Sequence, residues 1–294
     1  MRRWRPRRCC AGTSKPAGTA ASPAAASSST TVADGGSVET VLDDDGVLRI
    51  ELARPAAQNS LDPPMAEAFA ASVARTAEPG VRAVLITAQG KNFCVGGDIR
   101  AFAAMGDGIR RGLQELAASL HDSIQVLTTQ GAPVVSAVHG WCAGAGVGLP
   151  CFADVVVADE GTRFRAAYTA IGLSPDMGLT WLLPRLVGRA RARDMVLTNR
   201  IVTADEALAW GLVSRVAPAG TAAQLALGIA RDLAAGPLGT HTAIRQLLRD
   251  NESASLAEAM QAEARLIGSR AASAEGAVGI GAFLDGTTPD FRTV

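Results

Sequence analysis

Short apolar runs, separated by polar segments, mark the expected strands. Val38 to Leu42 and Val47 to Leu52 are two such runs, and Asp43-Asp44-Asp45-Gly46 lies between them. This order predicts a β-hairpin. Two further β-rich runs, bounded by glycine or proline, cover 81–87 and 133–138 and predict buried strands.

Other segments show the 3.6-residue period of amphipathic helices. Residues 63–77 have this spacing, and Asp62 before Pro63 is the favoured order for a helix start. Residues 110–129 form a longer amphipathic segment. Strands alternating with helices predict an α/β core. Four more helical segments follow this core, at about 220–235, 237–250, 255–270 and 275–284.

The first 36 residues differ from the rest of the chain. They are rich in Arg and then in Ala, Ser and Thr, a composition that cannot build a core and predicts disorder. A transit peptide and an over-extended start of a GC-rich gene both fit it. The expected organisation is a tail at 1–36, a core at 37–217 and a helical region at 218–294. The expected location is the cytoplasm, or an organelle if the tail is a transit peptide.

Charge and cysteine usage exclude several classes of protein. Residues 1–33 carry six basic side chains and no acid, so the other 261 residues hold 22 basic and 28 acidic groups. A net negative body repels phosphate backbones, and a nucleic-acid function would rest on the tail alone. The five cysteines show no C-x-x-C pair, which predicts neither a zinc site nor a disulfide framework. No segment has the length and apolarity of a membrane span.

Two glycine-rich loops are the candidates for chemistry. The first covers 91–102 and the second 139–149, each placed between a strand and a helix. Glycine lets a backbone N–H approach a ligand closely, and a helix N-terminus offers free N–H donors to an oxyanion. Either loop alone is also typical of a plain tight turn. The dinucleotide-binding fingerprint is excluded, because no G-x-G-x-x-G is present.

The order of four motifs resembles the crotonase (enoyl-CoA hydratase/isomerase) superfamily over residues 37–294. The family pattern contains an R-P…N-A-L turn, an F-x-A-G-G-D-I box, an N-G-x-A-x-G-G-G box and an A-x-E-A…G-L-V stretch. The matching segments here are Arg54 to Leu61, Phe93 to Ile99, Val138 to Gly146 and Thr203 to Val213.

The resemblance implies a fold, a substrate and a set of site residues. The fold would be a spiral of ββα units with a C-terminal helical trimerisation region, giving a homotrimer or a dimer of trimers. The partner would be an acyl-CoA thioester, with no metal and no cofactor beyond the coenzyme A of the substrate. The N–H groups of Gly97 and Ala145 would form an oxyanion hole. The expected substrate-binding residues are Cys94, Val95, Gly96, Asp98, Ile99, Arg100, Trp141, Gly144 and Tyr168.

The sequence departs from the family's hydratases at both catalytic glutamates. Their positions are occupied by Gly148 and Tyr168, so water addition lacks its acid/base pair. Asp176 remains, in a stretch that resembles 1,2-epoxyphenylacetyl-CoA isomerases. It is expected to move a substrate proton, although its place after Ser-Pro also fits a helix N-cap. Tyr168 would either donate a hydrogen bond or wall the pocket. At the C-terminus, Gly286-Thr287 replaces the family's Lys-Arg pair.

The expected function is therefore isomerisation of an acyl-CoA, by moving a double bond or changing a ring, with Asp176 as the acid and base. Three alternatives stay open. One is a hydratase-like or otherwise divergent enzyme of secondary metabolism. The others are a non-catalytic CoA-binding relative and a nucleic-acid-binding relative.

Overall fold

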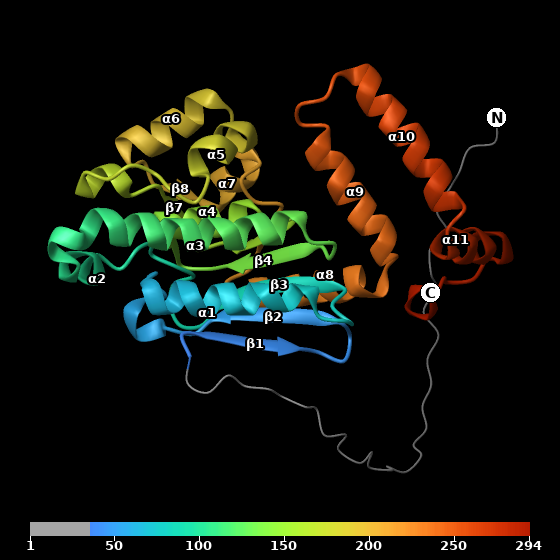
Figure 1. The fold of residues 1–294 in the computed structure, drawn as a ribbon, viewed down its shortest axis with the longest axis horizontal. Helices are drawn as coiled ribbons and strands as arrows, with labels where there is room; N and C mark the ends of the chain where they lie inside the picture. Colours follow the sequence, from blue (N-terminus) through green and yellow to red (C-terminus); the bar gives the residue numbers. More distant parts are fainter. Residues whose placement is uncertain (1–35) are drawn as a thin grey trace, which may run out of the picture.

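The computed structural model describes residues 36–294, so the expectations for the N-terminal tail lie outside the described residues. Two mixed sheets form the core (Figure 1). The larger has the order β1-β2-β3-β4-β6-β9 and the smaller the order β5-β7-β8. The strands are β1 Val38–Leu42, β2 Val47–Leu52, β3 Ala83–Ala88, β4 Val134–Val138, β5 Trp141–Ala143, β6 Val155–Asp159, β7 Arg163–Arg165, β8 Val202–Thr203 and β9 Arg215–Ala217.

The predicted hairpin is confirmed: β1 and β2 pair antiparallel, and Val38 lies opposite Leu52. From β2 to β9 the larger sheet is parallel. After β4 the chain enters the smaller sheet as β5, returns to the larger sheet as β6, forms β7 and β8 of the smaller sheet, and completes the larger sheet with β9. The second glycine loop, 139–149, directly follows β4 and contains β5 and the start of α4.

Helices cover both faces of the larger sheet. They are α1 Pro63–Ala74, α2 Ile99–Ala104, α3 Ile109–Thr129, α4 Ala145–Cys151, α5 Leu179–Val187, α6 Arg189–Thr198, α7 Ala204–Trp210, α8 Ala222–Ala235, α9 Leu238–Asp250, α10 Leu256–Ala271 and α11 Ala274–Asp285. Asp62 is the predicted N-cap of α1 and accepts a hydrogen bond from the Met65 N–H at 2.9 Å. None of the helices in the described part of the chain is both long and apolar enough to cross a membrane.

Strand periodicity divides the core into two layers. Val84 and Ile86 of β3 join the apolar cluster under α1 and α3, whereas Leu85 faces α8. Helix α8 covers that second face with a stripe of alanines at every fourth position, Ala222, Ala226, Ala230 and Ala234. Successive residues of a strand point to opposite faces, so each strand contributes to both layers.

The C-terminal helices α9, α10 and α11 extend away from the core (Figure 1). None of these three helices has a buried residue. Arg245 joins α9 to the core, through an ion pair of 2.8 Å with Asp154 and a hydrogen bond of 2.8 Å to the carbonyl of Leu127. The C-terminal helical region therefore has two parts: α8 packs on the sheet, and α9–α11 form an arm.

Candidate active site

The two glycine loops pack against each other through their main chains. The Cys94 N–H donates to the Trp141 carbonyl at 3.2 Å, and the Ala143 N–H donates to the Cys94 carbonyl at 2.9 Å. A Cβ atom at Gly146 would lie 2.2 Å from the Cys94 carbonyl oxygen. Only glycine permits this approach, because carbon and oxygen need well over 3 Å. The glycine boxes therefore set the distance between the loops.

Each loop contributes one residue with a free main-chain N–H to the lining of the same cavity. The Leu61 N–H donates to Gly96, and the Asp98 N–H donates to Leu61, so the Gly97 N–H points away from this pairing. Ala145 is the first residue of α4, where an N–H has no partner within the helix. Among residues 36–294, neither N–H has an acceptor. Gly97 and Ala145 both line a cavity of about 420 Å³.

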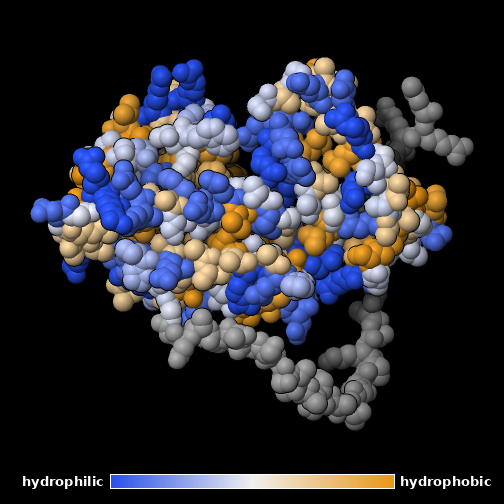
Figure 2. All heavy atoms as spheres, viewed as in Figure 1, coloured by the Kyte–Doolittle hydropathy of each residue, from blue (hydrophilic) through white to orange (hydrophobic). Residues whose placement is uncertain are grey.

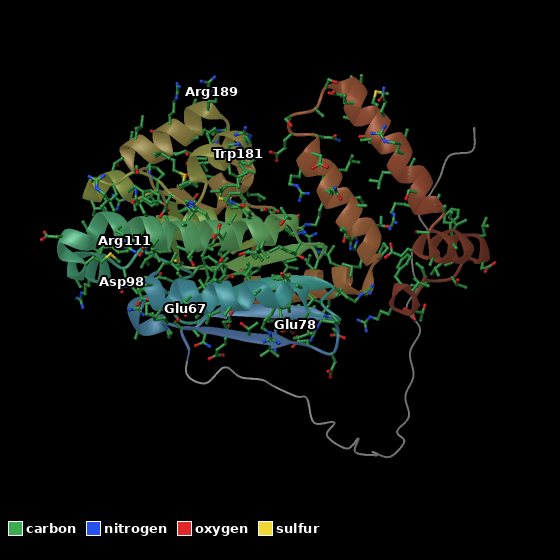
Figure 3. All side chains as sticks on the ribbon, in the orientation of Figure 1. Glu67, Glu78, Asp98, Arg111, Trp181 and Arg189 are labelled. Atoms are coloured by element: carbon green, nitrogen blue, oxygen red, sulfur yellow. The ribbon has the colours of Figure 1, made fainter. Side chains whose placement is uncertain are left out.

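An ion-pair network of Arg54, Asp62 and Asp98 holds the first loop in place. Arg54 lies 3.0 Å from Asp98 and 2.9 Å from Asp62. Asp98 also caps α2, where it accepts from the N–H groups of Arg100 and Ala101, and it lies at the start of this helix (Figure 3). Burial opposes ionisation of Asp98, but the hydrogen bonds from Ala101 and Arg54 outweigh it and keep its pKa below the usual range. The Asp98 side chain is thus engaged by the protein.

Asp176 and Tyr168 form a hydrogen-bonded pair at the cavity. The Tyr168 hydroxyl donates to Asp176 Oδ1 at 2.5 Å. Burial and the neighbouring Asp176 charge raise the pKa of Tyr168, so the phenol stays protonated and acts as a donor. Asp176 does not cap a helix: α5 begins at Leu179, and its N-cap is Gly178, without a side-chain cap. Of the side chains within residues 36–294 that line the cavity, only that of Asp176 is charged.

Met177 occupies the space beside the first missing glutamate. A Cβ atom at Gly148 would lie 2.4 Å from the Met177 Cβ. Met177 is fully buried and has a left-handed backbone with φ of 52°. Its N–H donates to Nε2 of His121 at 3.0 Å. Position 148 thus lacks not only the carboxylate but also the room for a side chain.

The cavity brings together most of the residues expected from the sequence. These are Val95, Gly96, Gly97, Ile99, Gly144, Ala145, Tyr168 and Asp176.

The other four expected residues lie outside the cavity. Cys94 is fully buried, its main-chain groups bond to the second loop, and burial raises its thiol pKa to about 12. The side chain of Asp98 is bound by Arg54 and by the start of α2. Arg100 is exposed on the surface of α2. Trp141 lies in β5, and its N–H donates to Asn92. The structure therefore gives contacts to the protein, and not to the cavity, for Cys94, Asp98 and Trp141.

The walls of the cavity include residues that the sequence reasoning missed. Helix α3 contributes Leu113, Leu116 and Ala117, at the three- and four-residue spacing of one helix face. That spacing could have identified them from the sequence, since it marks one apolar face of the long helix that follows the first glycine loop. The roles of His121 and Met177 had no such signal. Among residues 36–294, no three His, Cys, Asp or Glu side chains come together as a metal site.

Known proteins are similar to this chain in sequence and in fold. The family model described as enoyl-CoA hydratase/isomerase matches residues 43–293. A probable enoyl-CoA hydratase of Rhodobacter capsulatus is 36% identical over 247 residues, 84% of this chain and 95% of that protein. The 1,2-epoxyphenylacetyl-CoA isomerase of Escherichia coli is 32% identical over 249 residues, with the same coverage.

Solved structures give the same result. A putative enoyl-CoA hydratase/isomerase from Mycobacterium abscessus superimposes with a TM-score of 0.83 at 36% identity, over 86% of this chain and 98% of that one. The match to the family model covers strands β2 to β9 and both glycine loops. The chain belongs to the enoyl-CoA hydratase/isomerase family, the crotonases.

Proposed function

We propose that this protein is an acyl-CoA isomerase that moves a proton through a thioester enolate. The observation that carries the proposal is Asp176, the one charged side chain among the described residues that line the cavity, to which Gly97 and Ala145 also contribute. A proton shift between two carbons needs one group that accepts and returns the proton. A lone carboxylate suits that task.

The two N–H groups would bind the thioester oxygen. As the substrate loses a proton from carbon, the electron pair of that C–H bond moves into the enolate and negative charge develops on the oxygen. Two fixed donors stabilise this charge, each by about 3–4 kcal/mol in comparable sites. The released proton would pass to the Asp176 carboxylate and return to another carbon of the acyl group. The double bond moves, and no atom is gained or lost.

Tyr168 supports this role of Asp176. Its hydroxyl donates to Oδ1, and a hydrogen bond to a charged acceptor stabilises the ionised carboxylate. The second carboxylate oxygen would then face the substrate. Because the phenol stays protonated, Tyr168 would serve as a donor rather than as a base.

Hydration is the second candidate, since the relative from Rhodobacter capsulatus is described as a probable hydratase. Adding water requires a group that activates the water and a group that protonates carbon. Here Gly148 and Tyr168 stand at the two glutamate positions. Met177 leaves no room for a side chain at 148, which favours the isomerase over the hydratase.

The composition of the cavity favours an uncharged acyl group. Its walls are largely apolar, with Phe102, Leu113 and Ile171 among the larger side chains. No Lys, Arg or His side chain lines it in the described part of the chain. A second carboxylate on the acyl group would lack a cationic partner and would meet the charge of Asp176. We therefore expect apolar enoyl-CoA or aromatic acyl-CoA substrates rather than dicarboxylic ones.

The arm of α9–α11 supports assembly of several copies, as a homotrimer or a dimer of trimers. Apolar side chains on this arm are exposed, among them Leu248 at 68%, Phe283 at 85% and Leu284 at 77%. Apolar atoms gather at the C-terminal side of the molecule (Figure 2). Several large apolar side chains exposed on one part of a protein typically mark an interface.

The test is a comparison of the parent protein with Asp176→Asn in deuterated water. The parent is expected to shift the double bond of an apolar 3-enoyl-CoA, or to open or close a ring, and to incorporate deuterium at carbon. The Asn variant should bind the acyl-CoA but neither exchange nor isomerise it, because an amide cannot accept the proton. Mass spectrometry of substrate and product gives both results.

Asp122→Asn is the matched control, since Asp122 is exposed on α3 and lies outside the cavity. It should behave like the parent, and thermal melts check that all three proteins fold. A hydrated product from the parent would favour the hydratase. Unchanged exchange in a folded Asp176→Asn variant would refute the role of Asp176.

A further inference from the structure

We infer that His121 is a positioning residue. By accepting a main-chain hydrogen bond from Met177, it would hold the segment 175–178, and with it the Asp176 carboxylate, in the conformation needed for turnover. The inference rests on the proposed function and adds a residue that does not itself touch the cavity. His121 is half-buried on α3. Its Nε2 lies 3.0 Å from the N–H of Met177, the residue directly after Asp176.

The place of His121 on α3 separates it from the substrate. Leu113 and Ala117 line the cavity, and His121 follows at the same four-residue interval, so it lies one turn further along the same side of the helix. His121 itself is not among the residues that line the cavity. His121 therefore contacts the main chain next to Asp176 from outside the cavity.

The segment needs such support because of its backbone. Met177 adopts φ of 52°, a left-handed conformation that a side-chain-bearing residue rarely takes. The main-chain N–H of Met177 is buried with the rest of the residue, and it has no other acceptor within residues 36–294. Without His121 this N–H would be buried and unpaired, which disfavours the observed conformation.

Helix α3, which carries His121, is itself held firmly in the core. Helix α3 spans Ile109–Thr129 and packs on α1. Leu120 and Ile124, on either side of His121 in the sequence, are buried in the main apolar cluster. On the other side, Tyr168 holds the Asp176 carboxylate. The carboxylate is thus fixed by a side-chain donor, Tyr168, and its backbone by a side-chain acceptor, His121.

The hydrogen bond specifies the form of the imidazole. A main-chain N–H can only donate, so Nε2 must carry its lone pair, and the ring proton lies on Nδ1. A glutamine at this position can present its Oε1 as an acceptor at a similar distance from the helix, whereas leucine fills similar space without any acceptor. The pair of variants His121→Gln and His121→Leu therefore separates acceptance of a hydrogen bond from packing.

The experiment measures backbone exchange and steady-state kinetics for both variants. In His121→Leu, the Met177 amide should lose protection from hydrogen exchange, and kcat for isomerisation should fall about 10- to 100-fold. KM should change little, because the oxyanion donors and the cavity walls are untouched. His121→Gln should keep both the amide protection and most of kcat.

Ser123→Ala controls for general weakening of α3. The buried Ser123 hydroxyl donates to the Ser119 carbonyl at 3.0 Å, so this variant also loses a hydrogen bond of the helix but should retain kcat. If Ser123→Ala lowers kcat as much as His121→Leu, the loss in the latter is unspecific and the inference fails.

Three further results would overturn the inference. Unchanged amide protection in His121→Leu would show that His121 does not hold the segment. Loss of Met177 amide protection in His121→Leu with an unchanged kcat would show that this hydrogen bond does not matter for turnover. Equal loss of kcat in the Gln and Leu variants, with protection kept in the Gln variant, would assign proton transfer to His121 instead. If the parent isomerises no acyl-CoA, the proposed function fails, and the exchange measurement still decides whether His121 holds the segment.

Discussion

Gly148→Ala tests whether Met177 closes the position of the first hydratase glutamate. The added Cβ would lie 2.4 Å from the Met177 Cβ and 3.2 Å from the Met177 carbonyl oxygen. Ordinary contact begins near 3.4 Å, so the Met177 segment would have to move by about 1 Å in a close-packed core.

The expected cost follows from two opposing effects. Overpacking of a core costs about 1–3 kcal/mol, and replacing a glycine inside a helix by alanine returns about 0.5–1 kcal/mol. From the middle of both ranges the net destabilisation is about 1 kcal/mol, which lowers the melting temperature by roughly 2–4 °C in a chain of this size. Because Asp176 precedes Met177, the shift should also lower kcat by up to about 100-fold.

Two comparisons make the result specific to Met177. Gly228 lies in α8 with open space around it, so Gly228→Ala should raise the melting temperature slightly through helix propensity alone. In a Met177→Gly background the opposing Cβ is gone, and a glycine adopts the left-handed backbone without strain. There Gly148→Ala should become stabilising, which is a reversal of sign.

The measurements are thermal melts of the four proteins of the Gly148/Met177 cycle and of Gly228→Ala, with turnover measured for those that fold. A Gly148→Ala variant that melts at or above the parent temperature, as Gly228→Ala should, would refute the argument. So would equal effects of Gly148→Ala in both backgrounds, since contacting residues are expected to couple by about 0.5–3 kcal/mol.

Three further outcomes are expected. Ala145→Pro removes one oxyanion donor at a first-turn position that tolerates proline, and turnover should fall about 100- to 1,000-fold with the fold retained; normal turnover in the folded variant would exclude this N–H as a donor. Tyr168→Phe keeps the ring but removes the donor to Asp176, so kcat should fall about tenfold, and steady-state kinetics that match the parent would contradict its supporting role. Phe283→Ser on α11 should shift the protein to smaller species in analytical ultracentrifugation, whereas an unchanged sedimentation coefficient would place the interface elsewhere.

Local sequence signals were sufficient for the longer helices. The predicted helices at 237–250 and 255–270 correspond to α9, Leu238–Asp250, and α10, Leu256–Ala271. Serine and glutamate placed three residues apart, Ser255 and Glu258, form a reciprocal cap at the start of α10, and such a cap depends only on neighbours in the chain. The smaller sheet was not predicted, because strands of two or three residues, such as β8, carry too little periodicity.

The residues that line the cavity were predictable where a glycine or a carboxylate marks a position, and not where a contact depends on the fold. Asp176 was selected as the remaining carboxylate, and the structure places it on the cavity. The sequence alone does not define the hydrogen bond between Tyr168 and Asp176, because a hydroxyl eight residues away can point in any direction. The contact between His121 and Met177 joins residues 56 positions apart, and no local pattern encodes it. Cys94 fell within a glycine box, but its main chain pairs with the second loop.

The close main-chain approach of the glycine loops also bears on how freely the site can change. Since Gly140 and Gly146 would place a Cβ at 2.1 and 2.2 Å from main-chain oxygens of the first loop, almost no substitution is tolerated at these positions. Residues 168–178 carry the proton-moving carboxylate on a separate segment, much of it exposed. The positions that tolerate least substitution are thus in the glycine loops, whereas the proton-moving carboxylate lies on a segment with more room for change. A library of variants confined to 168–178 is expected to yield folded acyl-CoA binders with altered reaction specificity, whereas substitutions at Gly140 and Gly146 are expected to yield mostly unfolded protein.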